Sequence, residues 1–258
     1  MKRPRLAAFD RNCFGDETVG IIGVDEAGRG AFAGPVVAAA LWMDRSFYGS
    51  SACRRIQPFM RDSKALTLEK REDAFRRLER CRDRGEIGFA YGIGSVEEIA
   101  EENILGATRL AMKRALDTIL EERGCPRHSW QEIDENDFFF CPRQAADIQK
   151  RPVILIDGNR LNPFFYPHRP LVKGDSRSLA IAAASIVAKV TRDRLMEKYH
   201  EEFPAYGFDR NRGYGTAAHI QAIHEHGILE IHREKFLEKL VAAGLGQVDG
   251  PEFNFKSL

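Results

Sequence analysis

Two short apolar runs joined by a glycine-rich loop constrain the fold of this chain more than any other feature. The first run, residues 21–24, ends at the adjacent carboxylates Asp25 and Glu26, and the second covers residues 36–42. Short apolar segments bounded by glycine and proline are typical of β-strands. Adjacent carboxylates at the end of a buried strand repel each other and resist desolvation, so they need a positive partner to remain ionised. A bound divalent cation would supply that partner, and the stretch therefore indicates a metal-dependent enzyme.

Strand and helix patterns alternate along the rest of the chain. Residues 87–91 alternate as a strand does, and the apolar run 153–157 is a predicted buried strand that ends at Asp157. Caps and helical spacing predict helices that begin near residues 67, 95, 105, 178, 216 and 234. The helix over 178–200 is apolar on nearly all sides between residues 180 and 188, so we expect it to be central and buried. Strands alternating with helices predict an α/β fold, a sheet covered by helices.

Other segments are predicted to be less regular. Residues 1–17 are expected to form a flexible arm, residues 45–63 a long loop, and residues 124–151 an insertion. The predicted domain organisation is a catalytic domain over residues 18–210, followed by a helical C-terminal extension and tail over residues 211–258.

Composition limits the classes of protein to which the chain can belong. The 258 residues are 43% hydrophobic and 30% charged, which is typical of a soluble globular protein. Five cysteines are scattered without a C-x-x-C spacing, which argues against a disulfide framework or a zinc ribbon and favours a reducing compartment. No apolar stretch approaches membrane-spanning length. We therefore expect a cytoplasmic protein without a membrane partner.

Three separate positions supply carboxylates for a metal site. Asp25 and Asp157 both end predicted strands, and Asp175 precedes the central helix. Carboxylates at strand ends in α/β folds commonly meet at one edge of the sheet. Three or four converging carboxylates, with Glu26, suit Mg²⁺ or Mn²⁺, and two such ions about 4 Å apart can support phosphoryl transfer. A single aspartate at a strand end more often only caps a helix or turn. The prediction of a metal site therefore depends on several carboxylates occurring together.

Positive charge is concentrated next to these carboxylates. Residues 160–194 contain seven basic and two acidic residues, although the whole chain has a formal net charge of only +1. A basic surface beside an acidic metal site is what a nuclease needs, because it attracts phosphates while the carboxylates hold cations. For Arg192 and Arg194, a solvated helix surface is an equally good interpretation.

Two other motifs point to different classes of protein. Gly28-x-Gly30 after a strand is similar to a dinucleotide-binding turn, but the third glycine, Gly34, is one position late and a strand pattern follows instead of a helix. We set that interpretation aside. Three histidines lie close together near residue 220, namely His219, His224 and His226. They do not share one helical face, so we interpret them as helix-end and surface residues and not as zinc ligands.

Several motifs occur in a fixed order between residues 20 and 227. They are Asp25-Glu26-Ala27-Gly28-Arg29-Gly30, Ala33-Gly34-Pro35, Asp62-Ser63-Lys64, Asn103-Ile104-Leu105, Leu155-Ile156-Asp157-Gly158-Asn159, Val172-Lys173-Gly174-Asp175, Thr191-Arg192-Asp193-Arg194 and Gly213-Tyr214-Gly215-Thr216. In this order they closely resemble the type 2 ribonucleases H, bacterial ribonuclease HII in particular. The resemblance implies a ribonuclease H-like mixed sheet flanked by helices, with a small helical C-terminal extension.

The resemblance also implies roles for particular residues. The four metal-binding catalytic carboxylates of the family fall on Asp25, Glu26, Asp157 and Asp175. The ribonucleotide-recognition loop falls on residues Gly28, Arg29 and Gly30, and the tyrosine that stacks on the sugar falls on Tyr214. Glycines allow backbone groups to approach a sugar, and the 2′-hydroxyl is what distinguishes RNA from DNA. Without the resemblance, a buried aromatic residue would be the better interpretation of Tyr214. Three lysines are candidate phosphate contacts, Lys64, Lys173 and Lys189.

The activity implied by the resemblance is hydrolysis of the RNA strand of RNA–DNA hybrids and nicking of duplex DNA on the 5′ side of embedded ribonucleotides. The implied cofactor is Mg²⁺ or Mn²⁺, with two ions in catalysis, and the implied roles are in DNA replication and repair. We expect a monomer, and the sequence does not support a sliding-clamp contact. Two alternatives are another two-metal phosphodiesterase, such as a DNA nuclease or resolvase, and a hybrid-binding protein without turnover.

Three departures from the family pattern limit the resemblance. The insertion over residues 124–151 is longer than usual, and the sequence assigns no role to it. Ala31 stands where the family usually has proline. Residues 232–236 match a basic segment of the family only in part, so the resemblance assigns no substrate contact to them.

Overall fold

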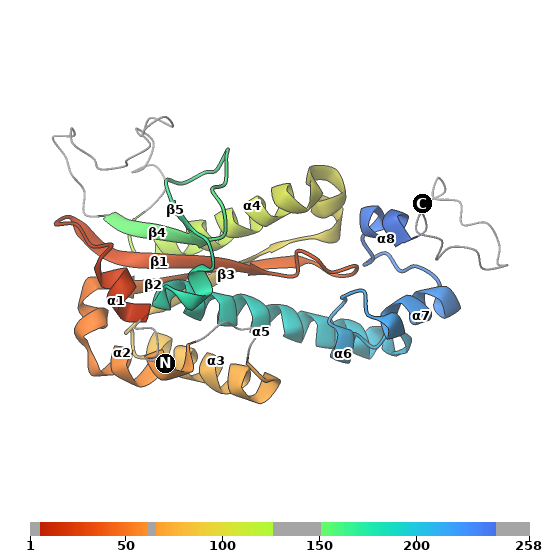
Figure 1. The fold of residues 1–258 in the computed structure, drawn as a ribbon, viewed down its shortest axis with the longest axis horizontal. Helices are drawn as coiled ribbons and strands as arrows, with labels where there is room; N and C mark the ends of the chain where they lie inside the picture. Colours follow the sequence, from red (N-terminus) through yellow and green to blue (C-terminus); the bar gives the residue numbers. More distant parts are fainter. Residues whose placement is uncertain (1–5, 61–65, 126–150, 241–258) are drawn as a thin grey trace.

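The computed structural model describes residues 6–60, 66–125 and 151–240, and its centre is a five-stranded sheet (Figure 1). The strands are β1 (Thr18–Ala27), β2 (Val36–Asp44), β3 (Gly88–Gly94), β4 (Arg151–Asp157) and β5 (Arg169–Leu171). Their order is β3-β2-β1-β4-β5. Strand β2 is antiparallel to both β1 and β3, whereas β4 is parallel to both β1 and β5. The sheet is therefore mixed, as expected.

Eight α-helices and several short 3₁₀-helices surround the sheet in the described part of the chain. The α-helices are α1 (Leu6–Arg11), α2 (Ser51–Ile56), α3 (Leu68–Asp83), α4 (Val96–Glu122), α5 (Leu179–Glu202), α6 (Phe208–Asn211), α7 (Ala217–His226) and α8 (Glu234–Leu240). The 3₁₀-helices are η1 (Arg45–Gly49), η2 (Gln57–Phe59), η4 (Gly174–Ser176) and η5 (Pro204–Tyr206). In Figure 1, α4 runs along one face of the sheet, and α3 and α5 lie on the other.

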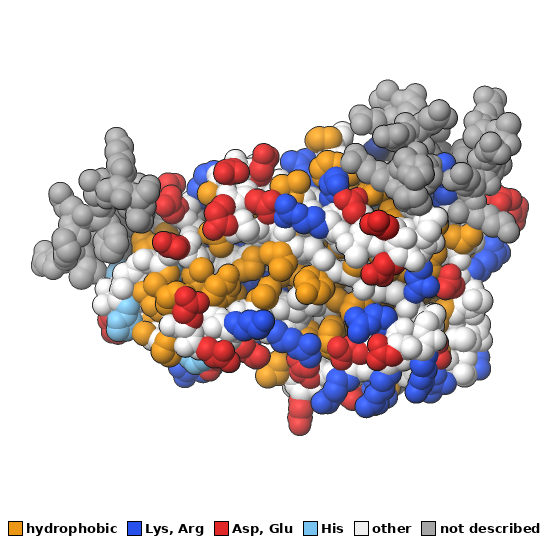
Figure 2. All heavy atoms as spheres, turned by 180° about the vertical axis from the view of Figure 1, so that it is seen from behind, with side chains coloured by type: hydrophobic (Ala, Val, Ile, Leu, Met, Phe, Trp, Pro, Cys, Tyr) orange, Lys and Arg blue, Asp and Glu red, His pale blue; other side chains and the backbone are white. Residues whose placement is uncertain are grey.

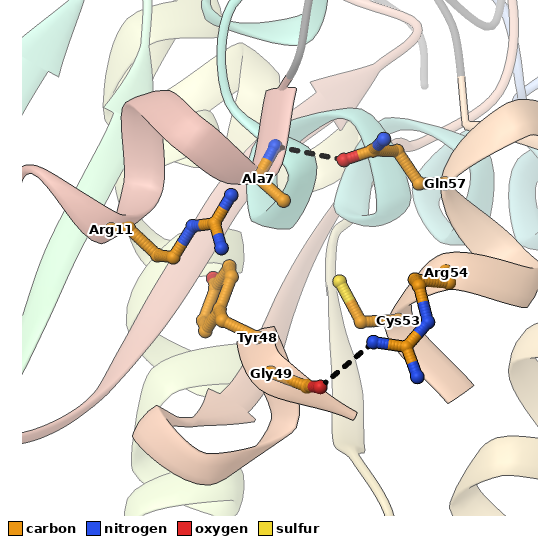
Figure 3. Close-up of a pocket in the computed structure, with 7 residues that line it drawn as sticks. All are labelled: Ala7, Arg11, Tyr48, Gly49, Cys53, Arg54 and Gln57. Carbon is orange, nitrogen blue, oxygen red and sulfur yellow. Dashed lines mark hydrogen bonds between the residues drawn. The ribbon is translucent and has the colours of Figure 1, made fainter. Parts of the chain in front are cut away.

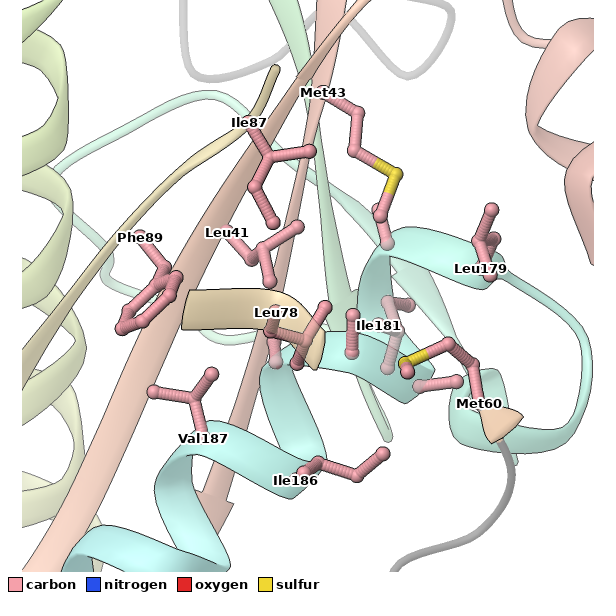
Figure 4. Close-up of a cluster of buried hydrophobic side chains, with 14 of the residues drawn as sticks. Leu41, Met43, Met60, Leu78, Ile87, Phe89, Leu179, Ile181, Ile186 and Val187 are labelled. Carbon is pink, nitrogen blue, oxygen red and sulfur yellow. The ribbon is translucent and has the colours of Figure 1, made fainter. Parts of the chain in front are cut away.

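Alternation along the strands produces two hydrophobic cores, one on each face of the sheet. In β2, Leu41 and Met43 pack with α3 and α5, whereas Ala40 and Trp42 pack with α4. Successive side chains of a strand point to opposite faces, so one apolar strand contributes to both cores. Figure 4 shows the α5 side of this arrangement, where Ile181 of α5 lies among side chains of the sheet and α3.

The predicted central helix packs unusually close to β1. A Cβ atom placed on Gly23 would lie only 2.1 Å from the carbonyl carbon of Ala180, at the start of α5. Only glycine can stand at this position, because any side chain would overlap the helix backbone. The residues of α5 from Leu179 to Ala188 are all buried, which confirms the prediction for this helix.

Side-chain caps begin the helices where the sequence predicts them. Thr67, Ser178 and Thr216 each accept a hydrogen bond from a backbone N–H of the first turn that follows. Ser95 forms a complete capping box with Glu98 at the start of α4. Asn103 interrupts α4 with a φ of 59°, so the two helices predicted near 95 and 105 form one element with a kink.

Three predictions about irregular segments need correction. Within the predicted arm 1–17, residues 6–11 form α1, in which Leu6, Ala7 and Asp10 are buried. The predicted loop over residues 45–63 contains η1, α2 and η2 in its described part. Strand β5 was not predicted. These elements are too short to show a hydrophobic period, and packing against the core stabilises them.

Most of the predicted insertion, residues 126–150, lies outside the described residues. On the face turned away in Figure 1, a band of hydrophobic side chains is bordered by both acidic and basic groups (Figure 2). This mixture agrees with the formal net charge of +1. Within the described residues, no helix is both long and apolar enough to cross a membrane.

Candidate active site

Two of the predicted carboxylates lie at the ends of neighbouring strands. Strands β1 and β4 are parallel, and Val24 is opposite Ile156 in their register. Asp25 and Asp157 are the residues that follow, so the fold brings them together at one end of the sheet although they are far apart in sequence. Asp25 is buried, and Glu26 and Asp157 are half-buried.

The turn after β5 places Asp175 next to this pair. Leu171 is opposite Asp157 in the β4–β5 register. The backbone N–H of Gly174 donates a hydrogen bond to Oδ1 of Asp157 at 2.6 Å, and Asp175 is the next residue in η4. This hydrogen bond connects the turn that carries Asp175 to the strand end that carries Asp157.

The electrostatic environment of Asp25 includes the charges of the other three predicted carboxylates. The pKa of Asp25 is raised well above its usual value, first by burial and then by the charges of Glu26, Asp157 and Asp175. The backbone N–H of Glu26 donates to Oδ1 of Asp25 at 2.7 Å and opposes this rise in pKa only partly. Like charges held together in a buried site favour either a bound proton or a bound cation.

The donor set suits a divalent cation. Its carboxylate oxygens are the hard ligands that Mg²⁺ and Mn²⁺ prefer. In the parts of the chain that the structure describes, however, no three His, Cys, Asp or Glu side chains form a preformed metal-binding group. A cation would therefore have to draw these carboxylates closer together, and it would relieve the repulsion that raises the pKa of Asp25.

The glycine-rich loop has a conformation that only glycine adopts easily at its first position. Gly28 has a φ of +96°, and a Cβ atom there would lie 2.0 Å from Nε of Arg192. Arg29 and Gly30 are exposed, and Arg29 donates to Oε1 of Glu26 at 3.0 Å. The loop thus starts at the carboxylates and presents its exposed residues directly beside them.

Tyr214 lies against the same loop. The backbone N–H groups of Phe32 and Ala33 donate to the carbonyl of Gly213, at 2.7 and 3.1 Å. The half-buried Tyr214 ring has the guanidinium carbon of Arg192 at 5.5 Å and the Nζ atom of Lys189 at 5.7 Å from its centroid. The structure therefore brings together the two elements that the family resemblance assigns to ribonucleotide recognition.

The three candidate lysines differ in their surroundings. Lys64 lies outside the described residues. Lys173 is exposed at the N-terminus of η4. Lys189 donates to Oδ1 of Asp193 at 2.7 Å, and the second carboxylate oxygen of Asp193 accepts from Arg71 at 3.1 Å. Lys189 thus takes part in a buried ionic group and is held in place by it.

Several residues near the site have surroundings that sequence reasoning missed. Arg192, for which a solvated surface was an equal interpretation, is fully buried and donates to the carbonyls of Pro35, Ala33 and Arg212. His219, interpreted as a helix-end or surface residue, is also fully buried. Arg233 is 2% exposed, and its guanidinium donates to carbonyls of the glycine-rich loop. No local pattern indicates these contacts, because the partners are distant in sequence.

A surface pocket elsewhere does not belong to this site. It lies among α1, η1 and α2 (Figure 3). Its lining residues are Ala7, Arg11, Tyr48, Gly49, Cys53, Arg54 and Gln57. None of the predicted site residues lines it, so the candidate site remains the carboxylate end of β1 and β4.

The architecture defines a class of protein first. The chain has the fold of a ribonuclease HII from Archaeoglobus fulgidus, solved in a complex with PCNA, with a TM-score of 0.58 and 21% identity over 88% of this chain and 97% of that one. A ribonuclease HIII, Bst-RNase HIII, solved with Mn²⁺, has a TM-score of 0.57 and 20% identity over 90% of this chain and 68% of that one. The fold is therefore that of the ribonuclease H-like proteins.

Sequence comparison then identifies the family. The profile of the Ribonuclease HII family matches residues 22–239. The chain is 37% identical to a ribonuclease HII from Anaplasma phagocytophilum, over 90% of this chain and 92% of the relative. It is 40% identical to one from Fusobacterium nucleatum subsp. nucleatum, over 86% of this chain and 87% of the relative. The chain belongs to the ribonuclease HII family and is a ribonuclease H, a hydrolase.

Proposed function

We propose that this protein is a metal-dependent endonuclease that hydrolyses the RNA strand of RNA–DNA hybrids and nicks duplex DNA on the 5′ side of embedded ribonucleotides. The products would have 3′-hydroxyl and 5′-phosphate ends. The observation that carries the proposal is the shared position of Asp25, Glu26, Asp157 and Asp175, directly beside a glycine-rich loop that packs against the Tyr214 turn.

In the proposed reaction, the four carboxylates hold Mg²⁺ or Mn²⁺ next to the scissile phosphate. Bound divalent cations lower the pKa of an attacking water and stabilise the departing 3′-oxygen. The exposed backbone of Arg29 and Gly30 approaches the 2′-hydroxyl of the ribonucleotide, and the ring of Tyr214 stacks on its sugar. Because the loop and the carboxylates are adjacent in β1 and its extension, recognition of the ribonucleotide positions its phosphate at the metal site.

Buried positive charge beneath the loop supports a polyanionic substrate. Arg192 and Arg233 are both buried, and the hydrogen bonds of their guanidinium groups go to backbone carbonyls. Within the described residues neither forms an ion pair with a carboxylate. Burial, together with the nearby charge of Arg192, lowers the pKa of Arg233 to about 9. Two incompletely compensated cations close to the recognition loop favour the approach of phosphates.

The experiment is cleavage of a labelled DNA duplex that contains one ribonucleotide, with each of the two metals in turn and with an all-DNA duplex as the reference substrate. We expect a single nick 5′ of the ribonucleotide and none in the all-DNA duplex. Equal cleavage of the two duplexes would contradict the proposal in favour of a general DNA nuclease. Hybrid binding without cleavage at any metal concentration would contradict it in favour of a binding protein.

Asp157→Asn should abolish cleavage and leave hybrid binding largely intact, because it removes charge from the metal site and little contact area. The matched control is Asp44→Asn, since Asp44 also ends a strand of the same sheet but accepts a hydrogen bond from Trp42 at 3.0 Å and is remote from the Asp25 carboxylate group. We expect this control to retain activity. Undiminished turnover in Asp157→Asn would show that Asp157 is not part of the proposed metal site.

A further inference from the structure

The segment after α7 pairs with the glycine-rich loop through its backbone. The N–H of Gly34 donates to the carbonyl of Ile231 at 2.8 Å, and the N–H of Arg233 donates to the carbonyl of Phe32 at 2.7 Å. Between them, Ala33 and His232 form an antiparallel β-bridge. Residues 229–236, here called the C-terminal segment, therefore fix one side of the recognition loop.

The side chain of Arg233 orients the exposed part of this loop. Its Nε atom donates to the carbonyl of Gly34 at 2.9 Å, and its Nη1 atom donates to the carbonyls of Gly28 and Arg29 at 2.8 and 3.1 Å. A planar guanidinium donates in fixed directions, so these three carbonyls cannot turn independently. Arg233 thus fixes the orientation of the loop backbone that is proposed to approach the 2′-hydroxyl.

The neighbouring His232 reaches Tyr214 through a second histidine. The N–H of Leu229 donates to Nδ1 of His232 at 2.8 Å, which requires the proton of a neutral His232 ring to be on Nε2. That Nε2 lies 3.1 Å from Nε2 of His219, which must therefore accept. His219 then carries its own proton on Nδ1, which lies 3.0 Å from the carbonyl of Tyr214 and donates to it. Each atom in this chain of hydrogen bonds has a single consistent role.

The surroundings of the His219 and His232 rings keep both rings neutral, as the hydrogen bonds between them require. Both histidines are buried, and their rings stack with centroids 5.3 Å apart. Aromatic side chains of Tyr206 and Phe208 also pack against His232. Burial, with the nearby His219, lowers the pKa of His232 to about 4, and burial also lowers the pKa of His219. Both rings are therefore uncharged near neutral pH.

We propose that His232 and Arg233 are positioning residues for ribonucleotide recognition: His232 orients Tyr214 through His219, and Arg233 orients the carbonyls of Gly28 and Arg29. The inference rests on the proposed function, since it assigns a role in the recognition step of the same site. It also explains how a segment without assigned substrate contacts can determine specificity: two adjacent residues hold the two sides of the recognition site.

The first test is a double-mutant cycle on the duplex with one ribonucleotide. His232→Phe preserves a ring but removes both hydrogen bonds, and we expect it to lower kcat/KM by about tenfold, the effect of one good hydrogen bond. In a Tyr214→Ala background the same change should have no further effect, because the orientation of Tyr214 no longer matters. His232→Gln, which can both accept and donate, should restore most of the activity. Additive effects of His232→Phe and Tyr214→Ala would overturn the inference.

A matched control separates this role from a general effect on folding. His224→Phe changes a half-buried histidine of α7, the helix that also carries His219, but His224 lies outside the hydrogen bonds that join His232 to Tyr214. This variant should keep kcat/KM within about twofold of the wild type. A loss in this control as large as that in His232→Phe would also overturn the inference. If the wild type itself does not cleave at the ribonucleotide, the proposed function fails; if it cleaves and the cycle is additive, only the positioning role fails.

Arg233→Lys tests the second half of the proposal. Lysine keeps the positive charge but cannot donate to three carbonyls in the fixed directions of a guanidinium. We expect kcat/KM to fall by about tenfold while its dependence on salt concentration stays that of the wild type, because the charge is unchanged. Full activity in Arg233→Lys would show that only the charge matters and would overturn the role of Arg233.

A direct measurement of the proton positions completes the test and does not depend on activity. Two-bond ¹H–¹⁵N correlation spectra of protein labelled with ¹⁵N-histidine distinguish the two neutral forms of each ring. We expect His232 to carry its proton on Nε2 and His219 to carry its proton on Nδ1. The opposite form at either residue would overturn the proposed chain of hydrogen bonds, whether or not the protein cleaves the duplex.

Discussion

Asp10 and Asp25 are both buried aspartates with raised pKa values, but their surroundings are opposite. Asp10 in α1 accepts hydrogen bonds at 3.0 Å from the Tyr48 hydroxyl and from the N–H of Ala180, at the N-terminus of α5. Asp25 is surrounded by three more carboxylates. Burial alone therefore does not distinguish a structural carboxylate from one at the proposed metal site. The charge of the neighbouring groups does.

The causes of the two pKa shifts make this difference explicit. Burial raises the pKa of Asp10 to about 6, and its hydrogen bonds act against that rise. At Asp25, burial and the charges of the neighbouring carboxylates act in the same direction. Hydrogen bonds to Oδ2 of Asp10 therefore offset part of the cost of ionising this carboxyl, although its Oδ1 has no hydrogen-bond partner among the described residues. At Asp25, the neighbouring charges add to the cost of ionisation, and a bound proton or cation would relieve it.

The largest expected effect is that of Asp25→Asn, which tests the catalytic side of the comparison. Removing this charge should lower cleavage by roughly 1000-fold, because it removes a proposed metal ligand at the centre of the candidate site. The same change should increase the free energy of unfolding measured in the absence of metal, since it relieves the repulsion from Glu26, Asp157 and Asp175. Denaturant unfolding and cleavage rates together check both parts.

Thermal unfolding with added Mg²⁺ or Mn²⁺ provides the control for this variant. A cation that binds only the folded protein raises the melting temperature, and the rise at a given concentration is larger for tighter binding. We expect a rise for the wild type and a much smaller one for Asp25→Asn. Equal rises in the two proteins would place the metal site elsewhere and remove the distinction between Asp25 and Asp10.

The second effect is on stability alone and comes from Asp10→Asn. Because the folded-state pKa of Asp10, about 6, is higher than its ordinary value of 3.8, the protonated group contributes stability below pH 4 that is lost as the pH rises through 6. An asparagine does not ionise and can still accept through its oxygen. The stability of the variant relative to the wild type should therefore increase by about 2 kcal/mol between pH 4 and pH 7.

Urea unfolding of both proteins at a series of pH values measures this difference. Cleavage by Asp10→Asn at neutral pH should stay within about twofold of the wild type, because Asp10 contacts α5 and not the carboxylate group. A stability difference that does not change with pH would contradict the raised pKa. A large loss of cleavage with unchanged stability would contradict the structural role.

Local patterns explain why the strand ends that carry the proposed catalytic carboxylates were predictable from the sequence. The apolar run 153–157 and the run before Asp25 are each a complete signal for a buried strand, and each ends at its own carboxylate. The ordinary geometry of α/β sheets then brings such strand ends together. The helices around the sheet were also predictable, because their caps at Thr67, Ser95 and Ser178 are local features.

The structural carboxylate and the residues that support the recognition loop were not predictable in this way. Asp10 lies in a six-residue helix, and its partner Ala180 is 170 positions away. Arg192 donates to Ala33, which is 159 positions away. Polar residues of this kind are usually exposed, and only the tertiary contacts of a particular fold provide the acceptors that allow their burial.

The smallest expected effect is that of Tyr48→Phe, which removes one of the hydrogen bonds that distinguish Asp10 from Asp25. The hydroxyl of Tyr48 stabilises the charged form of Asp10, so its loss should raise the pKa of Asp10 further. We expect a decrease of about 1 kcal/mol in the free energy of unfolding at pH 7 and a smaller decrease at pH 4, where Asp10 is protonated in both proteins. Tyr91→Phe, at a half-exposed position in β3, is the matched control and should change stability little at either pH. If the two variants lose the same stability at both pH values, the Tyr48 hydroxyl does not stabilise the charge of Asp10, and burial and the other hydrogen bonds of this carboxyl would then set its pKa.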